Sequence, residues 1–239
     1  MLGASSRAVT VGLALCVLLN VLAVHSYVVA NRYTGFADHF NTVGAIFLLF
    51  LLALLALGLG RFWSRGRLEP GEFMVIYAML LVGAAVPTMG FGGYLFGLIS
   101  GVTYYATPEN RWLTTLHPLL PDWAVLKQPQ AARYFYEGLP AGRAIPWQAW
   151  AGPLLWWALF ALAFYVVSVA AMALIRRQWA DREHLAYPLT SVPVALADSL
   201  EAGSRGGMLR SRLTWLGFAV AFCPVMYYWL RAVVPAMQA

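Results

Sequence analysis

Charge is scarce in this chain: of its 239 residues only 11% are charged, whereas 61% are hydrophobic. A soluble domain of this length carries roughly a quarter of charged residues. So much apolar surface cannot be hidden from water in one core, which excludes an ordinary soluble protein and indicates an integral membrane protein. We therefore predict an all-α fold, a polytopic bundle of transmembrane helices.

Lysine and cysteine are nearly absent. Lys127 is the only lysine beside fifteen arginines, and the two cysteines, Cys16 and Cys223, lie inside apolar runs. The basic residues cluster in short stretches between those runs, which is typical of membrane topology and not of a surface that binds nucleic acid. The cysteines match no metal or redox motif and are expected to behave as small buried hydrophobic residues.

Catalytic motifs are missing as well. The chain has no phosphate-binding glycine loop, no nucleophile elbow and no catalytic triad. Residues Asp181, Arg182, Glu183 and His184 form a dense charged cluster without the spacing of a metal site, and we expect it to be a solvated anchor. We thus predict no catalytic residue, no metal, no cofactor and no enzyme activity.

Five apolar runs are long enough to cross a bilayer of about 30 Å. The positive-inside rule places their arginine-rich connections and the N-terminus in the cytoplasm. Three parts are therefore expected: transmembrane helices in 1–106, an extracytoplasmic cap loop at 107–149, and further transmembrane helices in 150–239. The five runs cover residues 9–30, 40–59, 73–106, 150–175 and 213–234, and the arginines that orient them include Arg61, Arg65, Arg67, Arg176, Arg177, Arg182, Arg205, Arg210 and Arg212.

The third run contains residues that break helices. As one helix, residues 73–106 would extend about 50 Å, which is too long for one crossing and too short for three. A crossing followed by a broken or re-entrant helix fits this length. The backbone groups that a break frees must be buried in protein or line a polar cavity, so a substrate path is one interpretation and a structural kink is the other. The residues at the predicted break are Pro87, Thr88, Gly90, Gly92 and Gly93.

Further residues are expected to hold helices together. Gly93, Gly97 and Gly101 recur every four residues and form a stripe on which a second helix can pack closely. Asn20, deep in the first run, is expected to hydrogen-bond to a neighbouring helix and is a further candidate for the substrate path. Glu72 is expected at a helix start, where the helix dipole favours a carboxylate.

Two connecting segments are predicted to be ordered. Residues 185–202 are too short to span a bilayer and lie between arginine-rich flanks, which favours an interfacial or re-entrant segment on the cytoplasmic face. Loop 107–149 is rich in aromatic residues and prolines, so we expect it to pack as a small cap. Trp147 and Trp150 at its end suit the aromatic belt of a membrane interface.

Several stretches resemble a known family when they are taken in order. The resemblance is to the N-terminal half of a family of uncharacterised bacterial multi-pass membrane proteins that are distantly similar to oligopeptide transporters. Members of that family are much longer than this chain. The stretches are "LEPGEFMVIYAMLLVGAAVPTMG", "YYATPENRW", "RYFYEGLP", "IPWQAWAGPLLWW" and "RRQWADREHLAYPLTSVPVAL".

The resemblance implies half of an oligopeptide-transporter-like secondary transporter in the bacterial inner membrane. A second copy of the chain or a companion membrane subunit would complete the bundle. The alternative is a non-transporting structural subunit of a larger membrane complex. In both cases the expected partners are the lipid bilayer and membrane protein chains, and nucleic acid is not among them.

Overall fold

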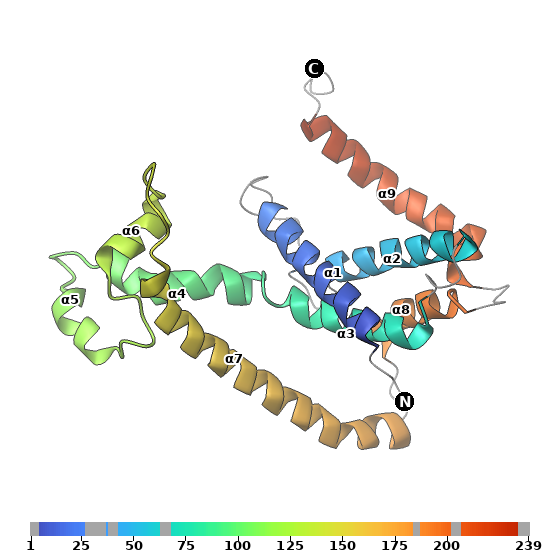
Figure 1. Ribbon diagram of the computed structural model, residues 1–239, viewed down its shortest axis with the longest axis horizontal. Helices are drawn as coiled ribbons and strands as arrows, with labels where there is room; N and C mark the ends of the chain where they lie inside the picture. The colour runs from blue at the N-terminus through green and yellow to red at the C-terminus, as the bar shows by residue number, and fades with distance from the viewer. Residues whose placement is uncertain are drawn as a thin grey trace. The chain divides into compact units, whose positions relative to one another are not determined.

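The computed structural model describes residues 5–26, 37, 43–62, 68–183, 187–201 and 207–233. Within these ranges every regular element is a helix, which confirms the all-α prediction (Figure 1). The chain divides into two compact units, of which the first comprises Met1–Pro87 with Tyr187–Ala239 and the second Thr88–Ala186. The three-part division by sides of a membrane stays a prediction.

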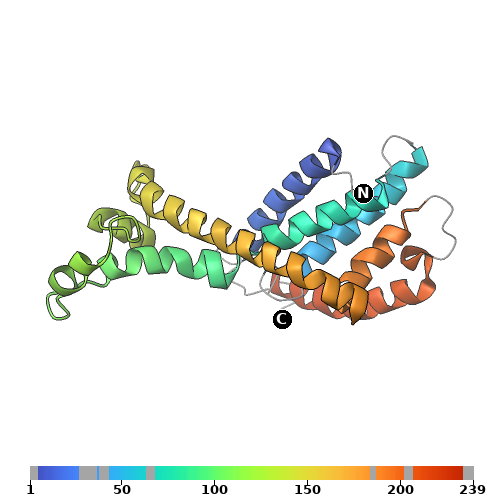
Figure 2. The same ribbon diagram turned by 90° about the horizontal axis from the view of Figure 1, so that it is seen from below.

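The first unit is built around α3. Pro70 occupies the first turn of this helix, where its missing N–H costs nothing. Figure 2 shows α3 beside both α1 and α2, and its buried side chains form the centre of the unit's core together with residues of α2 and α8. The helices of this unit are α1 (Ser6–Val24), α2 (Val43–Phe62), α3 (Pro70–Ala84), α8 (Pro188–Asp198), the short η6 (Met208–Arg210) and α9 (Arg212–Val233).

Helix α9 packs on α2 through its first turns. Phe50 of α2 stacks against Phe218 with ring centroids 5.4 Å apart and lies 6.1 Å from the ring of Trp215. The indole N–H of Trp215 donates to the carbonyl oxygen of Leu209 at 2.8 Å, which ties the start of α9 to η6. Beyond these turns α9 leaves α2 (Figure 1), and the side chains of Val220 and Val225 are exposed.

The second unit joins two long helical segments through a compact cap. Helices α5 and α6 lie at one end of the unit, where α4 and α7 meet them (Figure 1). A small core of Ile99, Leu126, Ala131, Ala132 and Trp150 holds this end together. The elements of the unit are η3 (Met89–Gly93), α4 (Tyr94–Tyr104), α5 (Trp112–Thr115), η4 (His117–Leu119), α6 (Pro129–Glu137), α7 (Trp147–Arg176) and η5 (Arg177–Arg182).

Among the residues that the structure describes, two helices are long and apolar enough to cross a membrane, judged by length and composition: α1 and the continuous helical stretch Trp147–Arg182. No residue in the most apolar part of the second stretch is buried, and Phe164 and Leu174 are 67% and 82% exposed. A helix that is hydrophobic all round and not covered by protein fits a lipid environment. The described apolar helices Val43–Gly58, Pro70–Ala84 and Arg212–Tyr227 are shorter.

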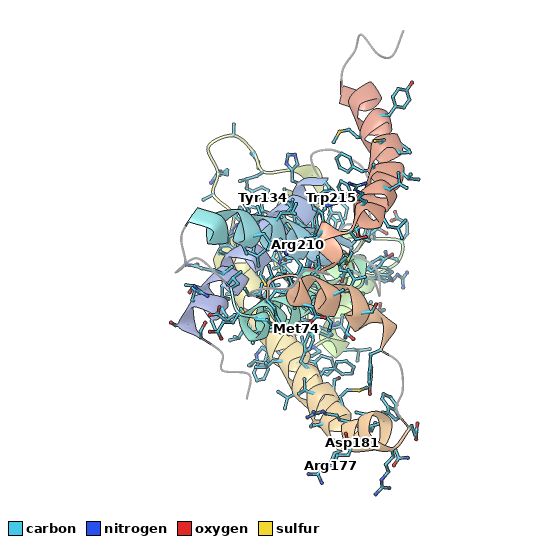
Figure 3. All side chains as sticks on the ribbon, turned by 90° about the vertical axis from the view of Figure 1, so that its right-hand side faces the viewer. Met74, Tyr134, Arg177, Asp181, Arg210 and Trp215 are labelled. Atoms are coloured by element: carbon cyan, nitrogen blue, oxygen red, sulfur yellow. The ribbon has the colours of Figure 1, made fainter. Side chains whose placement is uncertain are left out.

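The number of crossings and the orientation therefore stay predictions. Three of the arginines that orient the connections, Arg65, Arg67 and Arg205, lie outside the described residues, as does His184 of the charged cluster. Figure 3 shows Arg177 and Asp181 at the far end of the α7–η5 helix, where both side chains are exposed. Residues 185–202 contain the short helix α8, and their membrane position stays a prediction too.

Candidate functional site

The predicted break lies between α3 and α4. Helix α3 ends at Ala84, the chain turns through residues 85–88, and the short π-helix η3 leads into α4. The interval contains Pro87 and the three glycines of the candidate site. The 73–106 run is therefore helical on both sides of an interruption that begins within a few residues of Pro87.

Thr88 caps the N-terminal end of the π-helix. The backbone N–H of Phe91 lies within hydrogen-bonding distance of both the Thr88 carbonyl oxygen (3.3 Å) and the Thr88 hydroxyl oxygen (3.2 Å). The N–H of Gly93 donates to the same carbonyl at 3.0 Å, a five-residue spacing typical of a π-helix. Thr88 thus satisfies backbone donors that a helix start leaves without partners.

Asn20 of α1 forms a hydrogen bond with the C-terminal end of α3 in the first unit. Its amide nitrogen donates to the carbonyl oxygen of Gly83 at 3.2 Å and to that of Cys16, one turn back in α1, at 2.8 Å. The Gly83 carbonyl belongs to the last turn of α3, where carbonyls lack partners within the helix. The interhelical hydrogen bond expected for Asn20 is thereby confirmed, whereas its place in a substrate path stays a prediction.

Close packing of α1 on α3 accompanies this hydrogen bond. The thiol of Cys16 donates to the carbonyl oxygen of Met79 at 3.2 Å. A β-carbon added to Gly83 would lie 2.8 Å from the sulfur of Cys16, and one added to Gly12 would lie 2.5 Å from the sulfur of Met79. Sequence reasoning missed this contact, although Gly12, Cys16 and Asn20 recur every four residues and so share one face of α1.

A buried carboxylate fixes the opposite end of α3. Glu72 is 7% exposed and accepts hydrogen bonds from the side chains of Ser5 and Arg7 and from the backbone N–H of Glu69 at 3.1 Å. Ser5 also caps α1 by accepting from the N–H of Ala8 at 3.1 Å. The predicted helix-start carboxylate is confirmed, and it anchors the first turn of α1 to that of α3.

The pKa of Glu72 reflects these contacts. The carboxyl lies in the first turn of α3, before the apolar run that begins at Phe73. Burial raises its pKa, but the hydrogen bonds from Arg7, Ser5 and the Glu69 N–H, with the positive charge of Arg7, outweigh burial and hold the pKa below its ordinary value. Glu72 is therefore ionised at neutral pH and forms a partly buried ion pair with Arg7.

The glycine stripe of α4 faces an aromatic side chain in the second unit. The hydroxyl of Tyr136, on α6, donates to the carbonyl oxygen of Gly97 at 3.4 Å. A β-carbon added to Gly101 would lie 3.4 Å from the same hydroxyl and close to the ring of Tyr105. Gly93, the third member, is exposed. Gly97 and Gly101 thus make room for a tyrosine, a partner that their spacing does not specify.

The candidate residues fall into both compact units. Asn20 and Pro87 belong to the first unit, and Thr88, with the glycines of η3 and α4, belongs to the second. Within the described ranges no three His, Cys, Asp or Glu residues gather as metal ligands would. Each unit thus contains one end of the interrupted segment: the side chain of Asn20 binds the last turn of α3 in the first unit, and that of Thr88 binds the start of η3 in the second.

The comparisons with known proteins give a family without a function. A family model described as a family of unknown function (DUF6785) matches residues 2–239, so the chain belongs to that family. No curated protein matches the chain. No solved structure matches it either.

Proposed function

We propose that this chain is a polytopic protein of the bacterial cytoplasmic membrane, with about five crossings and a cytoplasmic N-terminus. In this proposal it is one half of an oligopeptide-transporter-like secondary transporter and has no enzyme activity of its own. A second copy or a companion subunit completes the bundle. The proposal extends the family assignment, which carries no function.

The interruption between α3 and α4 is the observation that supports transport. It lies inside an apolar segment and contains a turn and a π-helix, a form of helix that recurs at functional sites. Irregular backbone at membrane depth is tolerated only where it is buried in protein or lines a cavity. Secondary transporters hold substrates and ions at such discontinuous helices.

The exposed apolar helix α7 supports membrane insertion. No side chain in its most apolar part is buried, and arginines gather where the helix ends, with Arg176 and Arg177 followed by Arg182. Arginines at that end agree with a cytoplasmic position under the positive-inside rule. At its other end α7 starts with Trp147, which is 63% exposed and suits the outer interface of the membrane.

A transport assay with glycine variants tests the proposal. Purified chain is reconstituted into vesicles, and uptake of a labelled tripeptide is measured under an imposed proton or sodium gradient. We expect Gly92→Leu to reduce uptake at least tenfold, because a large side chain fills the space beside the broken backbone. Gly217→Leu on α9 is the matched control, because nothing lies within 4 Å of a β-carbon at that position.

One outcome of this assay contradicts the proposal, and a second narrows it to a transporter that a companion subunit completes. Uptake that survives in Gly92→Leu at the level of the control excludes the break as the substrate path. Uptake by the unmodified chain no higher than by empty vesicles excludes an oligopeptide transporter formed by copies of this chain. Reconstitution yield is compared for all variants, so that a loss of insertion is recognised.

A second candidate function is a structural subunit of a larger membrane complex. The local hydrogen bonds at the break favour it, because Asn20 binds Gly83 and Thr88 binds the start of η3, which occupies these groups within the chain. Cross-linking in native membranes separates the two functions. Contacts exclusively with chains of an unrelated complex favour the scaffold, and contacts with a second copy or a companion half favour transport.

A further inference from the structure

The cap of the second unit contains an apolar pocket with a volume of ≈ 320 Å³. Its walls come from α4, α6, the segment 139–146 and the start of α7. The volume is at the lower end of the range of about 300–1,000 Å³ usual for small-molecule sites. The residues that line it are Phe96, Ala131, Tyr134, Phe135, Leu139, Ile145, Pro146, Trp147 and Trp150.

Trp150, in the wall of this pocket, carries a buried polar group. The side chain is only 5% exposed, and its ring packs against Phe96 and Phe135 with centroids 5.8 and 5.6 Å away. Its indole N–H has no hydrogen-bond acceptor among the residues that the structure describes. A buried donor without an acceptor destabilises the folded state, so an oxygen atom of a ligand that accepts this hydrogen bond would stabilise the complex. The hydroxyl of Tyr134 (Figure 3), which lines the same pocket, accepts a hydrogen bond from the side-chain amide of Gln130 at 2.7 Å.

A polar hollow adjoins the apolar pocket. It shares Tyr134 and Leu139 with the pocket and is further lined by Gln130, Arg133 and Glu137 of α6. Arg133 is exposed and forms no ion pair within the described part of the chain. An apolar pocket with a buried donor in its wall therefore adjoins a hollow with a free guanidinium, and this combination of groups suits an amphiphile with a phosphate head.

The position of the pocket favours a membrane lipid as that amphiphile. Trp147 and Trp150 stand at the start of the helix that is long and apolar enough to cross a membrane. Tryptophans at the end of such a helix mark the level of the lipid headgroups and ester groups. A lipid at this level offers an acyl chain, an ester carbonyl and a phosphate at different depths, and guanidinium groups bind phosphate well.

We propose that the cap binds one phospholipid molecule, with an acyl chain in the apolar pocket, the ester carbonyl on the indole N–H of Trp150 and the phosphate on Arg133. The inference rests on insertion of the chain in a membrane, which is part of the proposed function, but it does not depend on transport. A chain that takes up no peptide would still bind the lipid.

Photo-cross-linking tests this site. The chain is reconstituted into phosphatidylcholine vesicles that contain a trace of phosphatidylcholine with a diazirine in its acyl chain. Labelling of residues 131–150 is measured by mass spectrometry relative to residues 159–169 of α7, whose exposed apolar side chains meet bulk lipid. Arg133→Gln and Trp150→Phe should each lower this ratio about fivefold, the loss expected for one hydrogen bond. Leu139→Trp should lower it as well by filling the pocket.

Matched variants outside the pocket give the controls. Leu119→Trp and Arg143→Gln change the same residue types in the cap but do not line either hollow, and should leave the ratio unchanged. An unchanged ratio in both Arg133→Gln and Leu139→Trp overturns the site. Equal labelling by a diacylglycerol probe, which has no phosphate, overturns the assignment to a phospholipid. Circular dichroism checks each variant, and Arg133→Gln, an exposed change, decides the result if a pocket variant does not fold.

Discussion

Replacing Gly83 by alanine is expected to loosen the contact between α1 and α3. The added β-carbon would lie 2.8 Å from the sulfur and 3.2 Å from the β-carbon of Cys16, and the first distance is too short for an undisturbed structure. Overpacking a well-packed core costs roughly 1–3 kcal/mol. Replacing a helical glycine by alanine in itself stabilises the fold by about 0.5–1 kcal/mol. We therefore expect a net loss of about 0–2.5 kcal/mol in the free energy of unfolding, with a central value of about 1 kcal/mol.

A comparison within the same contact tests the cause. Gly12→Ala would bring its β-carbon within 2.5 Å of the Met79 sulfur, but a methionine side chain is long and flexible and can move away. Cys16 is short and is held by its own helix, so it cannot move in this way. Although the first approach is shorter, Gly12→Ala should destabilise less than Gly83→Ala.

A double variant and a control complete the experiment. Cys16→Ala removes the sulfur, so Gly83→Ala combined with Cys16→Ala should recover part of the loss, with the β-carbon contact accounting for the remainder. Gly217→Ala has open space around it and should be neutral or slightly stabilising. Unfolding of the purified chain in detergent by urea, followed by tryptophan fluorescence, gives the free energies. Additive effects of the two substitutions, or equal stability of Gly83→Ala and Gly217→Ala, would refute the reasoning.

Two further predictions concern the ends of helices. The lowered pKa of Glu72 means that its contribution to stability is complete above its ordinary pKa near 4.5 and is lost as the pH falls through the lowered value. Glu72→Gln should therefore lower the free energy of unfolding, measured in urea at pH 7, by about 1–3 kcal/mol. The loss should be smaller with added salt, because Arg7 is partly exposed. The difference from the parent chain should shrink towards pH 3, and a difference that stays constant with pH contradicts the role of the ionised carboxylate. Thr88→Val removes the capping hydroxyl and should speed amide hydrogen exchange of residues 91–93 by roughly threefold to thirtyfold, as a lost cap of about 0.5–2 kcal/mol implies. The control Thr114→Val, in the short helix α5, should leave those amides unchanged, and equal exchange in both variants excludes the cap.

The interruption of the third apolar run could be predicted because it follows from length and local chemistry. A segment of 34 residues exceeds one crossing, and proline with clustered glycine disfavours a continuous helix wherever it occurs. The cap at Thr88 could have been found in the same way, because threonine is a preferred residue at a helix start. The π-helix that follows could not, because its five-residue hydrogen bonds depend on small differences in packing.

Partners across the fold could be predicted only in kind. A polar side chain in an apolar helix needs an acceptor, which led to an interhelical hydrogen bond for Asn20 but did not identify Gly83. The regular spacing of Gly97 and Gly101 indicated close contact and did not specify whether a backbone or the ring of Tyr136 fills the space. Such pairings depend on which helices meet, and one helix's own sequence does not contain that information.

Whether a substrate can displace the hydrogen bonds at the break depends on the strength of these bonds. A typical internal hydrogen bond contributes a net of only about 0.5–1.5 kcal/mol, because water or a ligand can replace either partner. The contact between Asn20 and the Gly83 carbonyl is of this kind, since its groups are neutral and Asn20 is half-buried. A substrate amide could therefore displace Asn20 at small cost, so that capping leaves a substrate site available. A scaffold, in contrast, needs the contact between Asn20 and Gly83 to stay formed. For that function the close packing of Gly12 and Cys16 of α1 on α3 matters more than the hydrogen bond of Asn20 itself.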